Sequence, residues 1–247
     1  MIYVLILVYN EEENIKDVIV STAQYLNQNK LDFTFVIVND GSTDNTKNII
    51  EQCSGDYKII PVNHETNLGV RWGFFNGFRK VIDMANDDDI VITKEGDNTS
   101  DSEIMLSMID KSSEYDVVLA SCYMKGGKVK NTTFVRVLLS FVANLLIKIF
   151  FREIAAFNTF SSFYRVFKVS ILRRYFEVYK GRELESFSFA CVVEMLIKIA
   201  RINARIVEVP MVLDAISRRG KSKMPKFKTM IDYFRIIRKF WLNKRIA

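Results

Sequence analysis

The chain has 247 residues, of which 49% are hydrophobic and 26% are charged. This length can bury the core of one large α/β domain, and the composition excludes a disordered or low-complexity chain. Three widely spaced cysteines and one histidine exclude a disulfide framework and a zinc site of ordinary spacing, and they favour a reducing compartment.

The net charge of +6 is unevenly distributed along the chain. The last 30 residues, from Arg218 onward, hold eleven lysines and arginines and one acid, so the preceding 217 residues carry a net charge of −4. A basic tail on a mildly acidic body is typical of contact with nucleic acid or with an anionic membrane surface.

The apolar stretches predict neither a signal peptide nor a membrane span. Ile2–Val8 is too short for a signal-peptide core, and no basic residue precedes it. Val137–Phe151 is interrupted by Ser140, Asn144 and Lys148, and it falls short of the ~18 apolar residues that a spanning helix needs. We therefore expect a cytoplasmic protein that is not integral to a membrane.

The first half of the chain alternates between strand and helix patterns. In chain order, the patterns predict a strand at Ile2–Val8, a helix at Glu11–Gln28, a strand at Phe33–Val38, a helix at Thr43–Cys53, a strand at Lys58–Val62, a helix at Val70–Ala85, a strand at Ile90–Thr93, a helix at Asp101–Ser113 and a strand at Asp116–Ser121. This alternation predicts an α/β fold with a mostly parallel sheet covered by helices on both faces. Ligands of such sheets bind beyond the carboxyl ends of the strands, so the loops there are the candidate site.

The second half has longer and more varied patterns. They predict a helix at Phe134–Phe151, a strand at Phe160–Phe167, a helix at Ser186–Arg201, a strand at Ala204–Val212 and, after the basic loop Ser217–Lys223, a basic helix at Pro225–Lys244. We therefore expect one domain at residues 1–217, with a first half at 1–125 and a second at 126–217, followed by a basic segment at 218–247.

The loop after the second predicted strand places Asp40 at the end of a buried strand, where a nucleotide base or ribose would lie. Gly41 permits a positive φ, and Ser42 or Thr43 can cap the next helix. A simple turn and a ligand site therefore both remain open here. His64, in the loop after the third strand, is expected to be an ordinary loop residue.

Glu95 and Asp97 follow the fourth predicted strand and are two residues apart. In an extended segment such residues project to the same side, and Gly96 between them allows close approach. Two carboxylates with phosphate oxygens form the usual site for Mg²⁺ or Mn²⁺. The alternative is a solvated acidic turn, as we expect for the run at 87–89.

Taken together, these loops resemble family 2 glycosyltransferases with the GT-A fold. The resemblance rests on Val8–Glu11, Val38–Thr46, Asn67–Gly69 and Glu95–Asp97, whose order and spacing agree over roughly residues 1–125. It implies a nucleotide-sugar donor (UDP- or GDP-sugar), Mg²⁺ or Mn²⁺, and inversion at the anomeric carbon. The first half of the domain would then bind the nucleotide sugar, and the second half would bind the acceptor.

The same resemblance implies roles for individual residues. Asp40 would hold the nucleotide base, and Asp97 would hold the metal-bound diphosphate, with Glu95 as the second metal ligand where the family usually has an aspartate. The other implied donor-binding residues are Tyr9, Asn10, Glu11, Asp44, Asn67 and Gly69.

Helix 134–151 carries a polar ridge of Arg136, Ser140, Asn144 and Lys148 at successive spacings of four. One interpretation is a core helix with one wet edge. The ridge is followed by motifs in a succession that is similar to the polyprenyl-phosphate glycosyltransferases, the dolichol-phosphate mannose synthase group; these are Ser161–Phe167, Glu194, Glu208–Pro210 and Arg218–Met224.

This second resemblance implies that Arg136 and Ser140 hold the acceptor phosphate. Because Cys122 stands where the group has a second arginine, Lys125 or Arg165 is expected to contribute in its place. It also implies that a basic loop closes over the diphosphate with Arg218, Arg219 and Lys223. The chain departs from the group at three positions, where Cys122 replaces an arginine, Thr159 an aspartate and Phe163 a glycine.

The basic tail helix is predicted to lie on an anionic membrane. Its apolar stripe consists of Phe227, Met230, Ile231, Phe234, Ile237 and Trp241, with basic residues elsewhere around the helix. Nucleic acid is discounted as a partner, because the acidic first half offers no basic groove to extend the contact. A separate membrane-anchoring subunit is a further partner to test.

The sequence thus predicts a glycosyltransferase, peripheral on the cytoplasmic face of a membrane, that transfers a sugar to a polyprenyl phosphate. An alternative is a family 2 enzyme that acts on a sugar hydroxyl, which needs a general base where a phosphate acceptor does not. An alternative of another class is an inactive sugar-nucleotide binding module.

Overall fold

The structure, a computed structural model, describes residues 1–186, 188–216, 219 and 226–242, without the side chains of 134–136, 139, 226–230, 241 and 242. The strands are β1 Ile2–Val8, β2 Phe33–Asn39, β3 Ile59–Asn63, β4 Ile90–Glu95, β5 Val117–Ser121, β6 Lys128–Lys130, β7 Arg165–Lys168, β8 Ile206–Pro210 and β9 Val212–Asp214. The helices are α1 Ile15–Gln28, α2 Thr46–Cys53, α3 Val70–Ile82, α4 Met105–Lys111, α5 Phe134–Phe150, α6 Val169–Val178, α7 Cys191–Arg201 and α8 Lys226–Leu242, with a short 3₁₀ helix at Arg152–Ile154.

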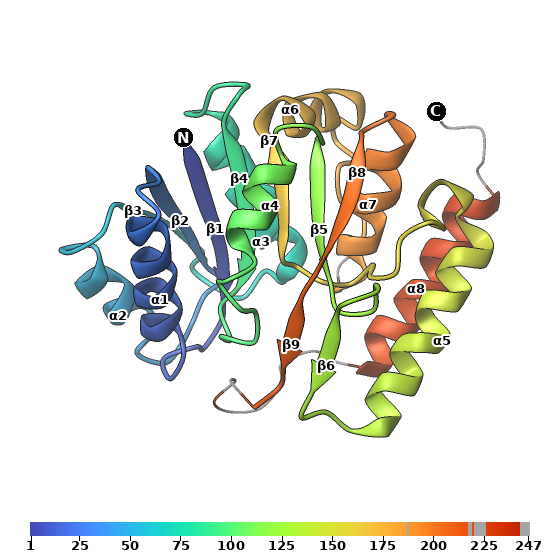
Figure 1. Ribbon diagram of the computed structural model, residues 1–247, viewed down its shortest axis with the longest axis horizontal. Coiled ribbons are helices and arrows are strands. Elements are labelled where there is room, and N and C mark those ends of the chain that lie inside the picture. Colours follow the sequence, from blue (N-terminus) through green and yellow to red (C-terminus); the bar gives the residue numbers. More distant parts are fainter. Residues whose placement is uncertain (187, 217–218, 220–225, 243–247) are drawn as a thin grey trace.

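One sheet with the strand order β3-β2-β1-β4-β7-β5-β8 forms the centre of the molecule (Figure 1). Adjacent strands of this sheet are parallel, except that β7 lies antiparallel between β4 and β5. The predicted mostly parallel α/β sheet is therefore confirmed. Alternate residues of β1 enter opposite cores, Leu5 with the α3 side and Ile6 with the α1 side, so helices cover both faces.

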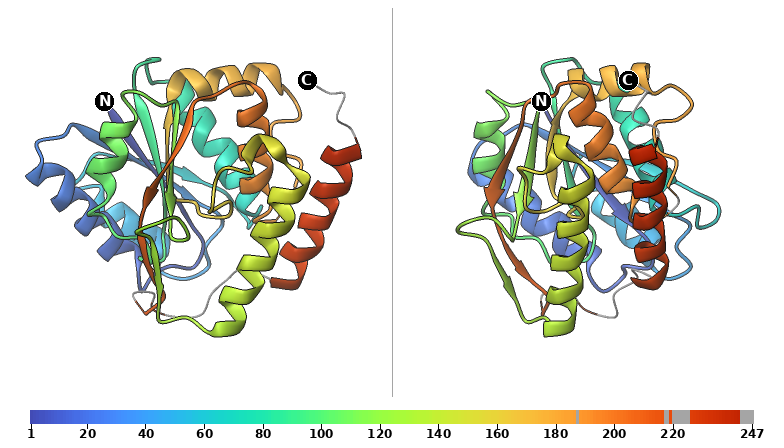
Figure 2. Two further views of the ribbon diagram at one scale, coloured as in Figure 1. Left: turned by 45° about the vertical axis from the view of Figure 1, so that its right-hand side comes forward. Right: turned by 90° about the vertical axis from the view of Figure 1, so that its right-hand side faces the viewer.

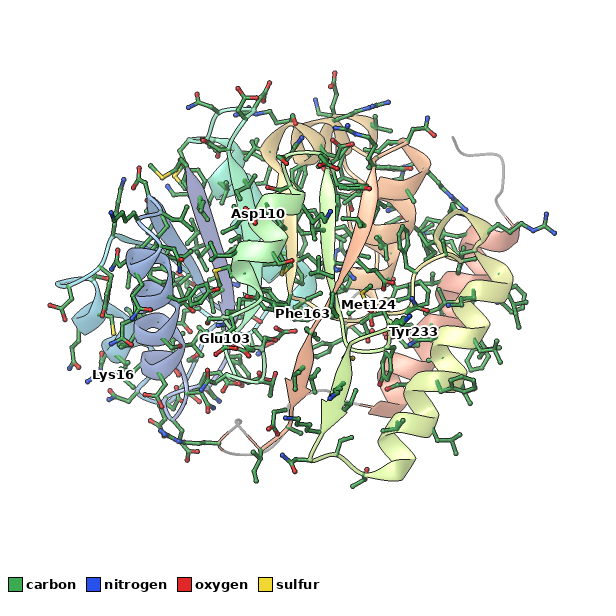
Figure 3. The ribbon with its side chains drawn as sticks, viewed as in Figure 1. Lys16, Glu103, Asp110, Met124, Phe163 and Tyr233 are labelled. Carbon is green, nitrogen blue, oxygen red and sulfur yellow. The ribbon has the colours of Figure 1, made fainter. Side chains whose placement is uncertain are left out.

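Two helices lie side by side at one edge of the sheet. Figure 2 shows α5 and α8 next to each other in both of its views. Helix α8 contributes Ile236, Ile237 and Phe240 to the larger core, and Tyr233 packs against the same core on the inner side of α8 (Figure 3). The prediction that Ile237 belongs to the membrane-facing stripe is therefore wrong, because this side chain is 8% exposed.

Two strands predicted in the second half differ from the structure, and two of its elements were not predicted. The strand predicted from Phe160 begins at Arg165. The loop before it is irregular, because the Glu208 carboxylate binds the backbone amides of Asn158 and Thr159. The strand predicted to end at Val212 is divided into β8 and β9, and the amide of Met211 between them donates to the Ser121 carbonyl. Strand β6 and helix α6 were not predicted, although α6 buries apolar residues at the helical spacing of three and four.

Candidate functional site

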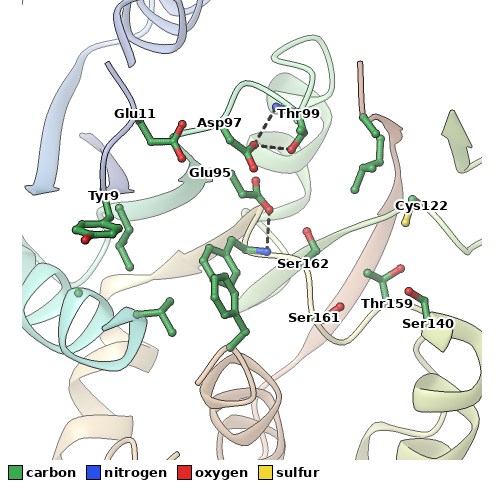
Figure 4. Close-up of a pocket in the computed structure, with 18 of the residues that line it drawn as sticks. Tyr9, Glu11, Glu95, Asp97, Thr99, Cys122, Ser140, Thr159, Ser161 and Ser162 are labelled. Atoms are coloured by element: carbon green, nitrogen blue, oxygen red, sulfur yellow. Dashed lines mark hydrogen bonds between the residues drawn. The ribbon is translucent and has the colours of Figure 1, made fainter. Parts of the chain in front are cut away.

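A cavity of about 470 Å³ opens at the carboxyl ends of the parallel strands (Figure 4). The loops after β1, β2 and β4 supply Tyr9, Asp40 and Asp97, and Cys122 follows β5. The opposite wall comes from α5, from Val129 and Leu213 of the β6-β9 pair, and from Thr159 and residues 161–163. The loops expected to bind a donor thus face the helix expected to bind an acceptor.

Hydrogen bonds tie the first two donor-side loops to each other. The amide of Asn10 donates to the Ser42 hydroxyl at 2.9 Å, and its side-chain oxygen accepts from the Thr43 amide at 2.8 Å. Asp44 accepts from the amides of Glu12 and Thr46. Asn10 and Asp44 therefore join the loops from outside the cavity, whereas Tyr9 and Glu11, which the first loop also contains, line the cavity.

The Asp40 carboxylate lies at the cavity wall but is only 7% exposed. Its Oδ1 accepts from the Leu68 amide at 2.9 Å, and its Oδ2 accepts from the Gly69 amide at 2.8 Å. His64 Nδ1 lies 2.7 Å from Oδ1. The expectation that His64 is an ordinary loop residue is therefore wrong, because its side chain is 5% exposed and bound to a site residue.

Glu95 and Asp97 both line the cavity. Glu95 accepts from the Ser100 hydroxyl at 2.7 Å and from the Phe163 amide at 3.1 Å, and Asp97 Oδ1 accepts from the Thr99 amide at 3.1 Å and from its hydroxyl at 2.7 Å. Gly96 between the two acids has no room for a side chain, because an added Cβ would lie 2.7 Å from Val8 Cγ1.

This pair of acids fits a divalent cation. Burial, and then the charge of Asp97, raise the pKa of Glu95, and a cation there would oppose both effects. Among the residues that the structure describes, no group of three or more histidine, cysteine or acidic side chains gathers to hold a metal. Two protein carboxylates with water and substrate phosphate oxygens are the ligand set that Mg²⁺ commonly uses.

Lys94 is a site-adjacent residue that the sequence analysis missed. It is 1% exposed, and its Nζ donates to Ser102 at 2.7 Å and to Thr22 of α1 at 3.2 Å, so it ties the loop after Asp97 to the helix behind it. Burial lowers the pKa of Lys94 to about 8. A lysine inside an apolar strand was the signal in the sequence.

On the acceptor side, Ser140 of α5 lines the cavity, as Figure 4 shows. Asn144 donates to the Asn158 carbonyl at 3.0 Å, and Lys148 donates to the Asn158 side chain at 3.1 Å. The polar ridge of α5 therefore divides into one residue at the cavity and two that hold a loop. The Arg136 side chain lies outside the described part of the structure.

All three departures from the polyprenyl-phosphate group, Cys122, Thr159 and Phe163, lie in the cavity wall. Cys122 is buried, and desolvation raises the pKa of its thiol to about 11, so the thiol is neutral at ordinary pH. The Phe163 ring packs between Phe74 and Phe189, with centroid distances of 5.0 Å and 5.4 Å. This wall is therefore apolar and uncharged where the group usually has an arginine and a glycine.

Arg165 was predicted to contact the acceptor phosphate, and the structure does not bring it to the cavity. It is 1% exposed in the middle of the sheet, where its guanidinium donates to the carbonyls of Val192 at 3.0 Å and Phe160 at 2.6 Å. Strand β7 directs this side chain into the core, so Arg165 ties the loop before β7 to the first turn of α7.

Two acids of the second-half motifs also have structural roles. Glu208 accepts from the amides of Asn158 and Thr159, and thereby shapes the loop before β7. Glu194 is fully buried, pairs with Lys198 at 2.6 Å and accepts from the amides of Glu185 and Ser186.

Of the predicted basic loop, Arg218 and Lys223 lie outside the described residues, and Arg219 lies against α1. The Arg219 amide donates to Asn14 at 3.0 Å, and its guanidinium pairs with Asp17 at 3.0 Å. Asn14 also donates to Glu11 at 2.7 Å. Arg219 thus lies beside the donor loops, because Asn14 connects it to Glu11 of the cavity wall.

Helices α5 and α8 expose a group of large apolar side chains. We call this surface the outer apolar face; it consists of Leu138, Phe141, Val142, Leu145, Ile149, Ile231 and Phe234, each between 45% and 62% exposed. Within the part of the chain that is described, no helix is long and apolar enough to cross a membrane.

The mostly parallel sheet flanked by helices is the fold of a GT-A glycosyltransferase, which confirms the predicted fold class. The chain matches the profile of Glycosyl transferase family 2 over residues 3–177 and belongs to that family. Dolichol-phosphate mannosyltransferase of Pyrococcus furiosus is 29% identical over 236 residues, which cover 95% of this chain and 62% of that protein. This chain therefore spans about three fifths of the length of that relative.

Two further proteins are informative. The UDP-N-acetylglucosamine–dolichyl-phosphate N-acetylglucosaminyltransferase of Methanococcus voltae is 29% identical over 146 residues, which cover 53% of each chain. Glucosyl-3-phosphoglycerate synthase of Mycobacterium tuberculosis, crystallised with Mn²⁺, UDP and glucosyl-3-phosphoglycerate, superposes with a TM-score of 0.67 at 17% identity, over 100% of this chain and 80% of that one. The latter likeness supports the fold alone.

Proposed function

We propose that the protein transfers a sugar from a UDP- or GDP-sugar to a polyprenyl phosphate at a membrane surface, with inversion at the anomeric carbon. The observation that carries this proposal is the position of α5. Its Ser140 lines the same cavity as Glu95 and Asp97, while its Phe141 and Ile149 point outward and are exposed. One helix thus borders both the reaction site and a surface suited to lipid.

On the donor side, the nucleotide would lie along the loops after β1 and β2, against Tyr9, Glu11, Asp40, Asn67 and Gly69. Asp97 and Glu95 would hold Mg²⁺ or Mn²⁺, which supplies positive charge for the departing diphosphate. Arg218, Arg219 and Lys223 are proposed to add positive charge from the basic loop. Asn10 and Asp44 act indirectly, because they fix the loops that carry Tyr9 and Glu11.

On the acceptor side, Arg136 and Ser140 are proposed to receive the lipid phosphate. A phosphate monoester is already anionic near neutral pH, so the reaction needs no general base. Support comes from the two relatives, whose names give dolichyl phosphate as their acceptor. Arg165 is not part of this site, because both of its contacts are to buried carbonyls.

The proposed membrane contact is the outer apolar face, together with the basic segment at 218–247. Apolar side chains exposed on paired helices, next to lysine and arginine, are suited to the interface of an anionic membrane. Residues 1–217 would then form the catalytic domain on the cytoplasmic face, and a separate anchoring subunit would be an additional partner.

One observation favours a second acceptor class. Cys122 leaves the acceptor wall without the charge of the expected arginine, and a neutral wall suits a sugar hydroxyl of a glycan better than a phosphate. The test that separates the two is nucleotide release from a panel of UDP- and GDP-sugars, with and without undecaprenyl phosphate. We expect release to depend on the lipid phosphate; release that depends only on a glycan would favour the second class.

A further inference from the structure

The loop between β3 and α3, residues 64–69, forms part of the cavity wall but has little apolar anchoring. Asn67 and Gly69 line the cavity, yet residues 65–68 are all exposed. His64 is the residue of this loop that turns a side chain inward, with 5% of it exposed. Since hydrophobic burial does not hold the loop, its position depends on polar contacts.

Those contacts converge on Asp40. The carboxylate accepts from the amides of Leu68 and Gly69 at 2.9 and 2.8 Å, and His64 Nδ1 lies 2.7 Å from Oδ1. A carboxylate has about four acceptor positions, so most of them face this loop. Close packing adds to the effect, because a Cβ on Gly41 would lie only 2.5 Å from the Asn67 amide.

The other ring nitrogen of His64 fixes the direction of its hydrogen bond. Asn76 Nδ2, on α3, lies 2.9 Å from His64 Nε2. An amide NH₂ can only donate, so Nε2 accepts and the ring proton lies on Nδ1, from which it is donated to Asp40. A continuous chain of hydrogen bonds therefore connects α3 through His64 to the carboxyl end of β2.

We infer that His64 is a positioning residue for the nucleotide donor. By donating from Nδ1 to Asp40, it holds the loop at 64–69 against the end of β2, so that Asn67 and Gly69 form the wall that the donor meets. This inference rests on the proposed donor site, and it gives His64 no direct contact with the substrate.

The test compares two amide variants that place a donor at different positions. In His64→Asn, the amide nitrogen is bonded to Cγ and reproduces Nδ1, whereas in His64→Gln it lies one bond further out and reproduces Nε2. UDP and GDP are titrated calorimetrically into the full chain with Mn²⁺, and thermal unfolding shows that each variant is folded. Glu65→Ala, at the exposed neighbouring position, is the matched control.

We expect His64→Gln to weaken binding of whichever nucleotide the wild type binds by roughly 10- to 100-fold, as for a lost hydrogen bond to a charged group. His64→Asn should stay within about threefold of the wild type, and Glu65→Ala should not change binding. Equal binding by His64→Gln and the wild type would overturn the inference while leaving the proposed function standing, and so would equal losses in both amide variants. If the wild type binds neither nucleotide, the proposed function fails, and the inference falls with it.

Discussion

The donor side and the acceptor side of the cavity differ in how their polar residues are used. On the donor side, Tyr9, Asp40 and Asp97 follow three parallel strands and all reach the cavity. On the acceptor side, Arg165 and Glu208 bind backbone groups instead. Parallel strands place the loops that follow them at one edge of the sheet. In the second half, polar side chains of the antiparallel strand and of β8 instead bind backbone groups, so they are not available to a ligand.

The largest effect should come from the donor side. Asp97→Asn removes one charge from the proposed metal pair, so we expect transferase activity to fall at least ~100-fold, as for the loss of one preorganised charge at a leaving group. EDTA should abolish turnover, and nucleotide release measures both. Asp88→Asn, at an exposed acid before β4, is the control and should change little. Full activity in EDTA would contradict the role of metal on this side.

A second experiment asks whether Arg165 belongs to the acceptor site or to the core. Arg165→Met removes the buried guanidinium that donates to the carbonyls of Val192 and Phe160, and we expect a loss of about 3 kcal/mol in the free energy of unfolding. Chemical denaturation measures this loss. Arg205→Ala, which breaks the exposed pair with Asp116, is the control and should have a much smaller effect. An unchanged stability with a raised acceptor KM would return Arg165 to the acceptor site.

The acceptor side also differs from the donor side in that its helix α5 carries most of the outer apolar face. Phe141→Asp and Ile149→Asp should each weaken co-sedimentation with anionic vesicles by about tenfold, because an apolar side chain in the interface contributes of order 1–2 kcal/mol. Val178→Asp, at a 54% exposed apolar position on α6, is the matched control. Nucleotide binding should be unchanged in all three variants. Equal sedimentation of the control and the α5 variants would mean that α5 does not face the membrane.

The smallest effect is expected from modifying Cys122. With the pKa of its thiol raised to about 11, the thiolate fraction at pH 8 is only ~0.1%, and it increases about tenfold with each pH unit up to that value. Activity after brief iodoacetamide treatment at pH 8 should therefore stay within about twofold, and mass spectrometry should find this residue unmodified. Rapid labelling at pH 8 would show that the acceptor wall is more polar than the structure indicates.

The sequence predicted the donor side better for a physical reason. A buried parallel strand is recognised from a short β-branched run, and the loop after such a strand must lie at the sheet edge, so Glu95 and Asp97 could be placed without a structure. The role of His64 could not be predicted in this way, because its contacts to Asp40 and Asn76 join the end of β2, the loop after β3 and helix α3, which are separated along the chain.

By itself, the sequence determined the α/β class, the parallel alternation and the loops at which chemistry is concentrated. It did so because strand and helix periodicity and the polar residues at strand ends are local properties of the chain. Only the tertiary structure decided that Arg165 is a core residue and that Ile237 faces inward, because the same arginine or isoleucine is stable on either side of an element. Which side is buried depends on the neighbours that the fold brings to it, and these come from distant parts of the chain.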